Sequence, residues 1–281
     1  MCMGFGCNAA GVVGCRIIDA PRERLLAVLT NSFVPCNGRF SALIAVITMF
    51  FCIFERSVLN SAVAAVGLLL VILLGIGMSF IVTRLLSATL LQGEAAPFAL
   101  ELPPYRRPRI IGVLVRSMLD RTLFVLGRAM LVAAPAGLLI WVLANVSIGG
   151  ASLLSLLAGW LDPLGGILGL DGMILLAFIL GLPANEIVLP VLLMGYMAEG
   201  TLQDTAALSD IHQLLLANGW TLLTAVCFLV FMLFHWPCST TLLTIRKETG
   251  SWRWAALAAV LPAGIGLGMC MLLNLAMQLL A

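Results

Sequence analysis

An amide and an acid, Asn185 and Glu186, lie at the centre of an otherwise apolar stretch of the chain. Apolar runs at 173–182 and 187–197 flank them, and each run would form a helix about 15 Å long, half of the hydrocarbon thickness of a bilayer. Backbone groups without a hydrogen-bond partner are tolerated at that depth only where they face protein or a watery cavity. The sequence therefore predicts a broken or re-entrant helix with Pro183 at its break.

A carboxylate at this depth needs a physical reason, because a charge at the centre of a bilayer costs at least about 2.5–3.5 kcal/mol. Glu186 could cap the N-terminus of a half-helix, where the helix dipole favours an anion. It could instead bind a transported ion or carry a proton, which we favour because Asn185 and the broken helix accompany it. The backbone of Gly181 and Pro183 would then contribute to the transport path.

A second break is predicted near the N-terminus, where Gly4, Gly6, Cys7 and Asn8 follow one another closely. Glycine allows close backbone approach and unusual dihedral angles, and a thiol and an amide come directly afterwards. Both breaks place an asparagine in apolar surroundings, which indicates a weak internal repeat of the kind found in transporters. So short a match could also arise by chance.

Three cysteines, Cys7, Cys36 and Cys238, stand beside helix-breaking residues. Thiolates are soft ligands whereas carboxylate and carbonyl oxygens are hard, so a mixed set suits a borderline divalent metal such as Fe²⁺ better than Ca²⁺ or Mg²⁺. His235 is either a further ligand or a structural residue. The residues that we expect to line a path for such an ion are Cys7, Asn8, Cys36, Asn185, Glu186 and Cys238. Three cysteines inside apolar runs are expected only to pack: Cys52, Cys227 and Cys270.

The composition places these residues in a membrane. Of the 281 residues, 62% are hydrophobic and 10% are charged, whereas soluble domains are about 45–50% apolar and about 25% charged. A soluble enzyme, a nucleic-acid binder and a disordered chain are thereby excluded. The net charge is only +2, and neither a Walker A sequence nor a CxxC pair occurs. We therefore expect neither nucleotide binding nor enzymatic activity nor a zinc ribbon.

Apolar runs long enough to cross a bilayer predict an all-α fold, a polytopic membrane helical bundle of about five spans with a broken or re-entrant gate-type helix. The spans are expected at residues 40–54, 61–83, 122–145, 214–236 and 254–281. Four regions are predicted: 1–38 with a truncated first break segment and a cytoplasmic loop, 39–172 with membrane helices and a basic cytoplasmic stretch at 84–121, 173–200 with the second break, and 213–281 with the C-terminal membrane helices.

The positive-inside rule predicts how the 173–200 segment lies. If the basic stretch at 84–128 is cytoplasmic and this segment crosses the membrane fully, Arg246, Lys247 and Arg253 fall on the outer side. If the segment turns back, they fall on the inner side with the other basic residues. We therefore predict a hairpin that re-enters the membrane.

Five motifs make the chain resemble the membrane domain of the bacterial ferrous iron transport protein B family. They are MGFGCN at 3–8, LTNSFVPCNGR at 29–39, ELPPYRRPR at 101–109, LPANEIVLP at 182–190 and HWPCSTTLLTIRKETGS at 235–251. The resemblance implies two gate segments and Fe²⁺ uptake across a bacterial inner membrane, with Fe²⁺ as the transported ion and no permanently bound cofactor. It also implies that Cys7, Glu186 and Cys238 are path residues.

The chain departs from that family in ways that bear on its function. Members usually carry a GTP-binding domain, a helical linker domain and further membrane helices before the first gate, and the half-helix that should precede Gly4 is missing. Ala9 and Ala10 follow the gate asparagine, where a proline is common. We therefore expect a GTP-binding part supplied in trans and contact with membrane lipid, either as a single copy or as a homo-oligomer, and no nucleic acid.

Two other interpretations stay open at the level of sequence. A gate-type permease for an organic solute such as a nucleoside would bind its substrate without iron and would have no use for the thiols. A non-transporting truncated fragment would have no function without an adjacent upstream reading frame.

Overall fold

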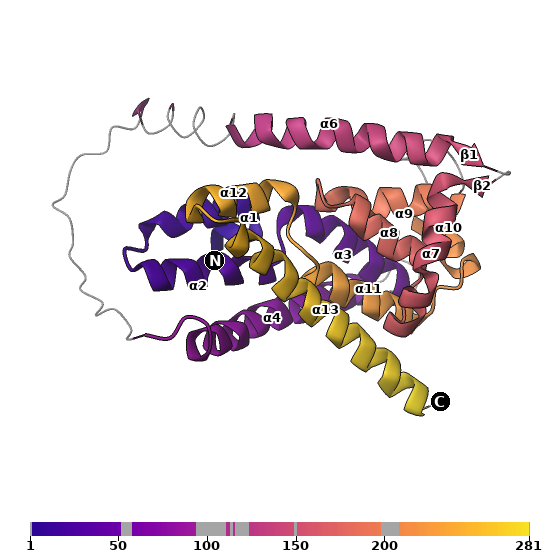
Figure 1. Ribbon diagram of the computed structural model, residues 1–281. Coiled ribbons are helices and arrows are strands. Elements are labelled where there is room, and N and C mark those ends of the chain that lie inside the picture. The colour runs from indigo at the N-terminus through magenta and orange to yellow at the C-terminus, as the bar shows by residue number, and fades with distance from the viewer. Residues whose placement is uncertain are drawn as a thin grey trace.

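The computed structural model describes residues 2–51, 58–93, 111–112, 115, 124–148, 151–197 and 208–280 (Figure 1). Within these ranges the chain is helical apart from its turns and one small β-ladder, which confirms the predicted all-α class. The α-helices are α1 (Asn8–Gly14), α2 (Pro21–Thr30), α3 (Asn37–Phe51), α4 (Val58–Ala88), α6 (Phe124–Asn145), α7 (Leu153–Leu168), α8 (Gly172–Leu180), α9 (Val188–Met197), α10 (Leu208–Ala217), α11 (Leu222–Phe234), α12 (Ser239–Thr249) and α13 (Trp252–Leu280). Short 3₁₀ helices are η1 (Cys2–Phe5), η2 (Cys15–Ile17), η3 (Asn31–Phe33) and η5 (Asn185–Ile187), and strand β1 (Ser147–Ile148) pairs antiparallel with β2 (Ala151–Ser152).

Four stretches of the described chain are long and apolar enough to cross a membrane, and a bent helix pair makes a fifth if it is counted as one span. The four stretches are Pro21–Phe51, Asn60–Ala88, Leu222–Thr249 and Trp252–Leu279. The predicted polytopic bundle is therefore confirmed.

The continuous spans and the broken spans occupy different places in the bundle. The most apolar windows of α4 and α13 are only 17% and 28% buried, whereas those of Pro21–Phe51 and Leu222–Thr249 are 56% and 61% buried. In Figure 1 the C-terminal half of α13 extends away from the other helices, and α6 runs along one side of the bundle. Since the broken stretches are the more buried ones, protein shields their unpaired backbone from lipid, as a bilayer requires.

Aromatic rings fill the interior between α8 and α11. The ring of Phe178 packs edge-on against Phe231 at 4.7 Å between centroids, and it lies 5.0 Å from the ring of His235. Edge-to-face packing is a favoured geometry for aromatic pairs. This packing holds the C-terminal end of α11 against α8 and places His235 inside the bundle.

Residues 146–172, where no span is predicted, contain helix α7. This helix meets α8 at a bend of 108°, and the Asp171 carboxylate caps α8 by accepting a hydrogen bond from the Ile174 N–H at 2.6 Å. Gly172 allows the close approach, because a Cβ atom at that position would lie 2.0 Å from the carbonyl oxygen of Ala158. This helix was not predicted, because its apolar run is shorter than a span and contains Pro163.

The predicted break between the apolar runs at 173–182 and 187–197 is present. Helix α8 ends at Leu180, and the chain then passes through a turn and η5 before α9 begins. By length and apolarity the first candidate span begins at Pro21, and a later one reaches Thr249 through a further break. The cytoplasmic loop expected up to residue 38 stays a prediction. The ELPPYRRPR motif at 101–109 lies outside the described residues.

Candidate functional site

The described chain contains four helix breaks that share one local design. Each break ends on a residue that directly precedes a new helix, and that helix begins with asparagine or serine. The four dipeptides are Cys7-Asn8 before α1, Cys36-Asn37 before α3, Ala184-Asn185 before η5 and Cys238-Ser239 before α12. Three of the four breaks therefore end on a thiol, and all three thiols belong to the residues that the sequence singled out.

Backbone geometry shows that the first and third breaks are equivalent. Cys7 has φ −153° and ψ 123°, and Ala184 has φ −149° and ψ 121°. The first break also accepts a hydrogen bond from the start of α3, where the Asn37 N–H donates to the carbonyl of Gly6 at 3.3 Å. In the third break the Ser239 N–H donates to the carbonyl of Leu182 at 2.8 Å. The weak internal repeat suggested by Asn8 and Asn185 thus extends to two pairs of breaks.

Arg39 connects the second break to the fourth through hydrogen bonds. It is fully buried, and its guanidinium donates to the carbonyls of Ser32 at 3.1 Å and Leu233 at 2.7 Å. It also donates to the carbonyls of His235 at 2.9 Å and Trp236 at 3.2 Å. These carbonyls lie where α11 and the α2–η3 segment end, so the cation meets the negative ends of two helical segments. Among the described residues no carboxylate lies within ion-pair distance of it.

Asn185 joins three of the breaks through its amide. The amide nitrogen lies 3.8 Å from the sulfur of Cys36, and the amide oxygen lies 3.2 Å from Nε2 of His235. The side chain of Asn185 is only 4% exposed. The predicted path residues Cys36 and Asn185, 149 positions apart in the sequence, are therefore neighbours in the interior.

The remaining thiols end the first and the fourth break. The sulfur of Cys238 lies 3.2 Å from Oγ1 of Thr241. Cys7 and Cys238 are partly exposed and Cys36 is buried. No group of three or more His, Cys, Asp or Glu side chains in the described ranges is placed to hold a metal ion. The three thiols therefore lie at helix breaks and form no metal-binding group of that size within the described ranges.

Unpartnered polar atoms gather at the same place. In the described part of the chain, the buried side-chain nitrogen and oxygen atoms without a hydrogen-bond partner belong to Asn8, Asn31, Ser32, Arg39 and Trp236. Every one of these residues lies in a break or in the first turn of the helix that follows it. Buried polar groups are normally paired, and an unpaired one marks a strain reservoir, a functional site or an unseen water or ion. The region where the four breaks meet is called the crossing below. Within the described interior, it therefore holds the buried polar side-chain atoms that lack a hydrogen-bond partner.

Asn31 connects the second break to the first. Its amide nitrogen donates to the carbonyl of Asn8 at 3.0 Å. Its amide oxygen lies against two glycines, since an added Cβ would be 2.8 Å from that oxygen at Gly4 and 2.5 Å at Gly11. Glycine at these positions makes room for the amide, which accounts for Gly4 as a backbone residue of the first break.

Glu186 lies at the edge of this arrangement and is exposed, not enclosed. Its carboxylate is next to the first turn of α3, where a Cβ added at Gly38 would lie 3.9 Å from Oε2. The structure brings it beside Asn185 and the N-terminus of a half-helix, a position that suits both of the roles considered for it. Gly181 is buried at the end of α8, and Gly6 is exposed in the first break.

Sequence reasoning missed Arg39 and Asn31 and left His235 open. Arg39 stands within the LTNSFVPCNGR motif and is a charge at the start of an apolar helix, which is a signal that could have drawn attention to it. Asn31 is a polar residue at the end of an apolar stretch in the same motif. Their partners are far away in sequence, so their roles could not be read from spacing.

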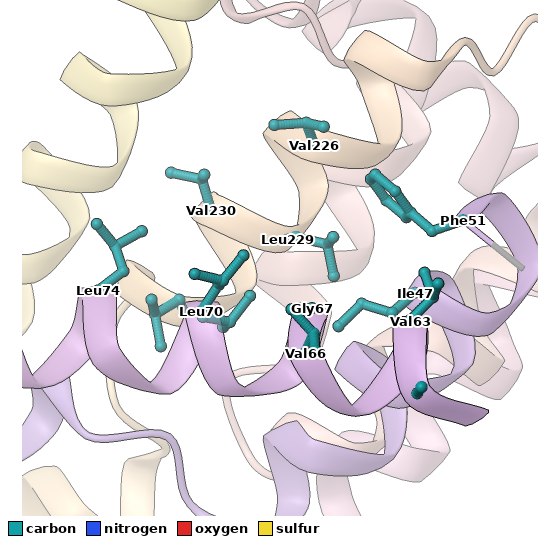
Figure 2. Close-up of a pocket in the computed structure, with 13 residues that line it drawn as sticks. Ile47, Phe51, Val63, Val66, Gly67, Leu70, Leu74, Val226, Leu229 and Val230 are labelled. Atoms are coloured by element: carbon teal, nitrogen blue, oxygen red, sulfur yellow. The ribbon is translucent and has the colours of Figure 1, made fainter. Parts of the chain in front are cut away.

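An apolar groove lies away from the breaks. It is a groove of about 510 Å³ between α3, α4 and α11 (Figure 2). Apolar side chains line it, among them Ile47 and Phe51 of α3, Leu70 of α4 and Val230 of α11. The lining of this groove offers no ligand for a cation.

Comparison with known proteins connects this geometry to a family. Residues 68–121 match the family model described as Ferrous iron transport protein B C terminus, and residues 126–252 match the model described as Nucleoside recognition. A relative named Fe(2+) transporter FeoB from Staphylococcus aureus is 30% identical over 270 residues, which cover 93% of this chain and 38% of the relative. Relatives with the same name from Methanocaldococcus jannaschii and Synechocystis are 27% and 28% identical and cover 92% of this chain.

The chain thus spans about two fifths of the length of these relatives, 38% to 40%. No solved structure matches it. The C-terminal family model, the relatives that cover nearly the whole chain and the motifs at the breaks agree with one another. Over nearly its whole length the chain is a homologue of proteins named Fe(2+) transporter FeoB, and residues 68–121 match the model of the ferrous iron transport protein B C terminus.

Proposed function

We propose that this chain forms the permeation part of a ferrous iron transporter in a bacterial inner membrane. The observation that carries the proposal is the contact between the Cys36 sulfur and the Asn185 amide at 3.8 Å, in a region where Cys7 and Cys238 end two further helix breaks. Soft thiolates together with a hard oxygen suit a borderline divalent ion, and the relatives are named as Fe²⁺ transporters.

In this mechanism Fe²⁺ sheds its water shell at one side and exchanges it for sulfur and oxygen ligands at the crossing. Because the thiols belong to different breaks, a small shift of one helix pair changes how many of them the ion can reach. Binding must stay weak enough for the ion to leave. Glu186 at the edge supplies a carboxylate where the ion enters or leaves the crossing.

The energy and the timing of transport would come from a second component. A GTP-binding part supplied by another chain would act on the helices at the cytoplasmic side, and this chain would act as a transporter component and not as an enzyme. Membrane lipid is the direct surrounding of α4 and α13, whose apolar surfaces are largely exposed.

Radiolabelled iron uptake in bacterial cells that lack their own ferrous transporter tests the proposal. The chain is produced together with a GTP-binding part from a relative, and Cys36→Ser and Cys238→Ser are compared with Cys227→Ser. Cys227 is a buried thiol of α11 outside the breaks, so its variant is the matched control. We expect uptake to fall at least about tenfold in the first two variants, the size of effect seen when metal-site residues are altered, and to stay near wild type in the control.

Equal uptake in all three variants, at equal amounts of protein in the membrane, would contradict the role of the thiols. A nucleoside permease is the second candidate, because residues 126–252 match a model described as Nucleoside recognition. It predicts uptake of a labelled nucleoside that is indifferent to iron and to Cys36→Ser. Absence of both activities in the presence of a GTP-binding part would favour a non-transporting fragment.

A further inference from the structure

The imidazole of His235 is held in one tautomer by its surroundings. Its Nδ1 lies 2.8 Å from the carbonyl oxygen of Met232. A carbonyl oxygen only accepts hydrogen bonds, so Nδ1 must carry the proton that is donated to it. The ring is buried, with 1% of the residue exposed.

The other ring nitrogen, Nε2, acts as an acceptor. A second proton on Nε2 would turn the ring into a buried cation beside Arg39, whose guanidinium binds the carbonyl of His235 itself at 2.9 Å. No carboxylate in the described residues lies within ion-pair distance of either side chain. Two neighbouring buried cations without an anion are costly, so the neutral ring with a lone pair on Nε2 is the favoured form.

The lone pair on Nε2 decides which way the amide of Asn185 turns. The amide oxygen stands 3.2 Å from Nε2, but an oxygen cannot donate to a lone pair. A half-turn of the amide exchanges its nitrogen and oxygen and leaves their positions nearly unchanged. The nitrogen then donates to Nε2, and the oxygen takes the position 3.8 Å from the Cys36 sulfur and accepts from its S–H group.

We propose that His235 is a positioning residue that turns the Asn185 amide so that its oxygen and the sulfur of Cys36 form a ligand pair for a divalent cation. The identification of this cation as Fe²⁺ rests on the proposed function. A divalent first-row ion binds sulfur at about 2.3 Å and oxygen at about 2.0–2.2 Å. Because these two lengths together exceed 3.8 Å, a single ion can bind both atoms.

Binding of the ion releases the proton of the Cys36 thiol to water as the metal–sulfur bond forms. The amide oxygen of Asn185 thereby loses its donor and is free to bind the same ion, while its nitrogen stays on His235. A hydrogen bond from outside the ligand set thus fixes the direction of a ligand, which is how outer partners commonly tune metal sites.

The tautomer is tested in the metal-free protein, purified in detergent with ¹⁵N-labelled histidine. The chain contains only two histidines, so a His212→Gln variant assigns the spectrum. We expect His235 to show a protonated Nδ1 and an unprotonated Nε2. A proton on Nε2, in either the neutral or the charged ring, would overturn the proposal. This experiment involves no transport, so its result is independent of whether the chain carries iron.

The ligand pair is tested with Co²⁺, whose sulfur-to-cobalt absorption band reports thiolate binding. His235→Leu removes the acceptor for the amide nitrogen, whereas His235→Gln offers an oxygen in its place. We expect Co²⁺ binding to weaken about tenfold or more in His235→Leu and in Asn185→Leu, the usual effect of losing an outer partner or a ligand. In His235→Gln it should stay within about threefold of wild type.

Purified variants are compared at equal helical content. If Asn185→Leu binds Co²⁺ as tightly as wild type, the amide oxygen is not a ligand and the proposal is wrong. If His235→Gln and His235→Leu weaken binding equally, the ring acts through packing alone and the positioning role is wrong.

Discussion

Two segments of the molecule, the first half of the break region (residues 2–51) and its second half (residues 172–249), have breaks with the same backbone arrangement. The side chains at equivalent positions differ. Arg39 in the first half stands four residues after the proline of its break, and Thr241 stands at the same position in the second half. Both are fully buried, yet one carries a fixed charge bound to four carbonyls and the other a hydroxyl beside Cys238. The comparison teaches that the shared backbone places the breaks, while the unequal side chains decide what each half contributes.

Space beside the first helix of each half is also filled differently. In the first half the amide of Asn31 enters between Gly4 and Gly11. In the second half Gly181 has the position of Gly4, and the side chain of Val188 lies against it, with a would-be Cβ only 2.4 Å from Cγ2. In the first half, Asn31 of a separate 3₁₀ helix fills this space and connects two breaks. In the second half, Val188 of the helix that follows the same break fills it.

Neutralising Arg39 should have the largest effect and would break the comparison most directly. Arg39→Met leaves four carbonyls without their donor, and each buried group left unpaired costs about 1–3 kcal/mol. We expect the free energy of unfolding, measured in mixed micelles of mild detergent and SDS, to fall by about 3 kcal/mol or more. Thr241→Val, the equivalent change in the second half, should lower it by about 1 kcal/mol. Equal losses would show that the two positions are interchangeable.

Crowding the Asn31 amide should have the next largest effect. Alanine at Gly11 places a Cβ 2.5 Å from the amide oxygen, and overpacking of this kind costs about 1–3 kcal/mol. Gly264→Ala in α13 is the control, because nothing lies within 4 Å of the added Cβ, and it should stabilise the protein by about 0.5–1 kcal/mol as in other helices. Thermal unfolding of the two variants, measured side by side, would refute the packing role of Gly11 if both behaved alike.

Making the halves more alike should tighten ion binding. Ala184→Cys places a thiol at the position equivalent to Cys7, so the crossing gains a fourth thiol. We expect Co²⁺ to bind about tenfold more tightly, a difference of about 1.4 kcal/mol, and iron uptake to slow because release becomes harder. Ala184→Ser serves as the control of similar size. Unchanged binding in Ala184→Cys would mean that the third break does not face the thiols of the other three.

A peripheral ion pair should matter least and sharpens the contrast with buried Arg39. Arg16 donates to both carboxylate oxygens of Glu248, at 2.7 and 2.6 Å, and this hydrogen bonding raises the pKa of Arg16. The raised pKa stabilises the fold only below the range where arginine deprotonates, so no pH dependence is expected near neutrality. Glu248→Gln should cost no more than about 1 kcal/mol, and the loss should shrink in 1 M salt. A salt-independent loss above that size would contradict this assignment.

How far sequence reasoning reached can be judged from particular residues. The break at Pro183 was predictable, because a proline, an amide and an acid interrupt two short apolar runs whose lengths can be counted. The positions of Cys36 and Cys238 at helix breaks were predictable, since each follows a proline in a short motif. Helix α7 was not predictable, because its placement depends on how it packs against α8 at the bend.

The exposure of Glu186 and the burial of Arg39 were decided by contacts and not by local sequence. Hydropathy places Glu186 at the centre of an apolar segment, but the neighbouring α3 leaves its carboxylate at the edge of the crossing. Arg39 is buried because its partners Leu233 and His235 are supplied by a helix more than 190 residues later in the chain.

The sequence by itself determined that this is a membrane protein, that its helices are broken, and that thiols and amides stand at the breaks. These properties depend on residues within one turn or one span of each other, where proline, glycine and apolar length act locally. Only the tertiary structure decided that the four breaks meet, that Arg39 holds two of them together, and that His235 faces Asn185. Such contacts join segments far apart in the chain, and their geometry depends on how whole helices pack.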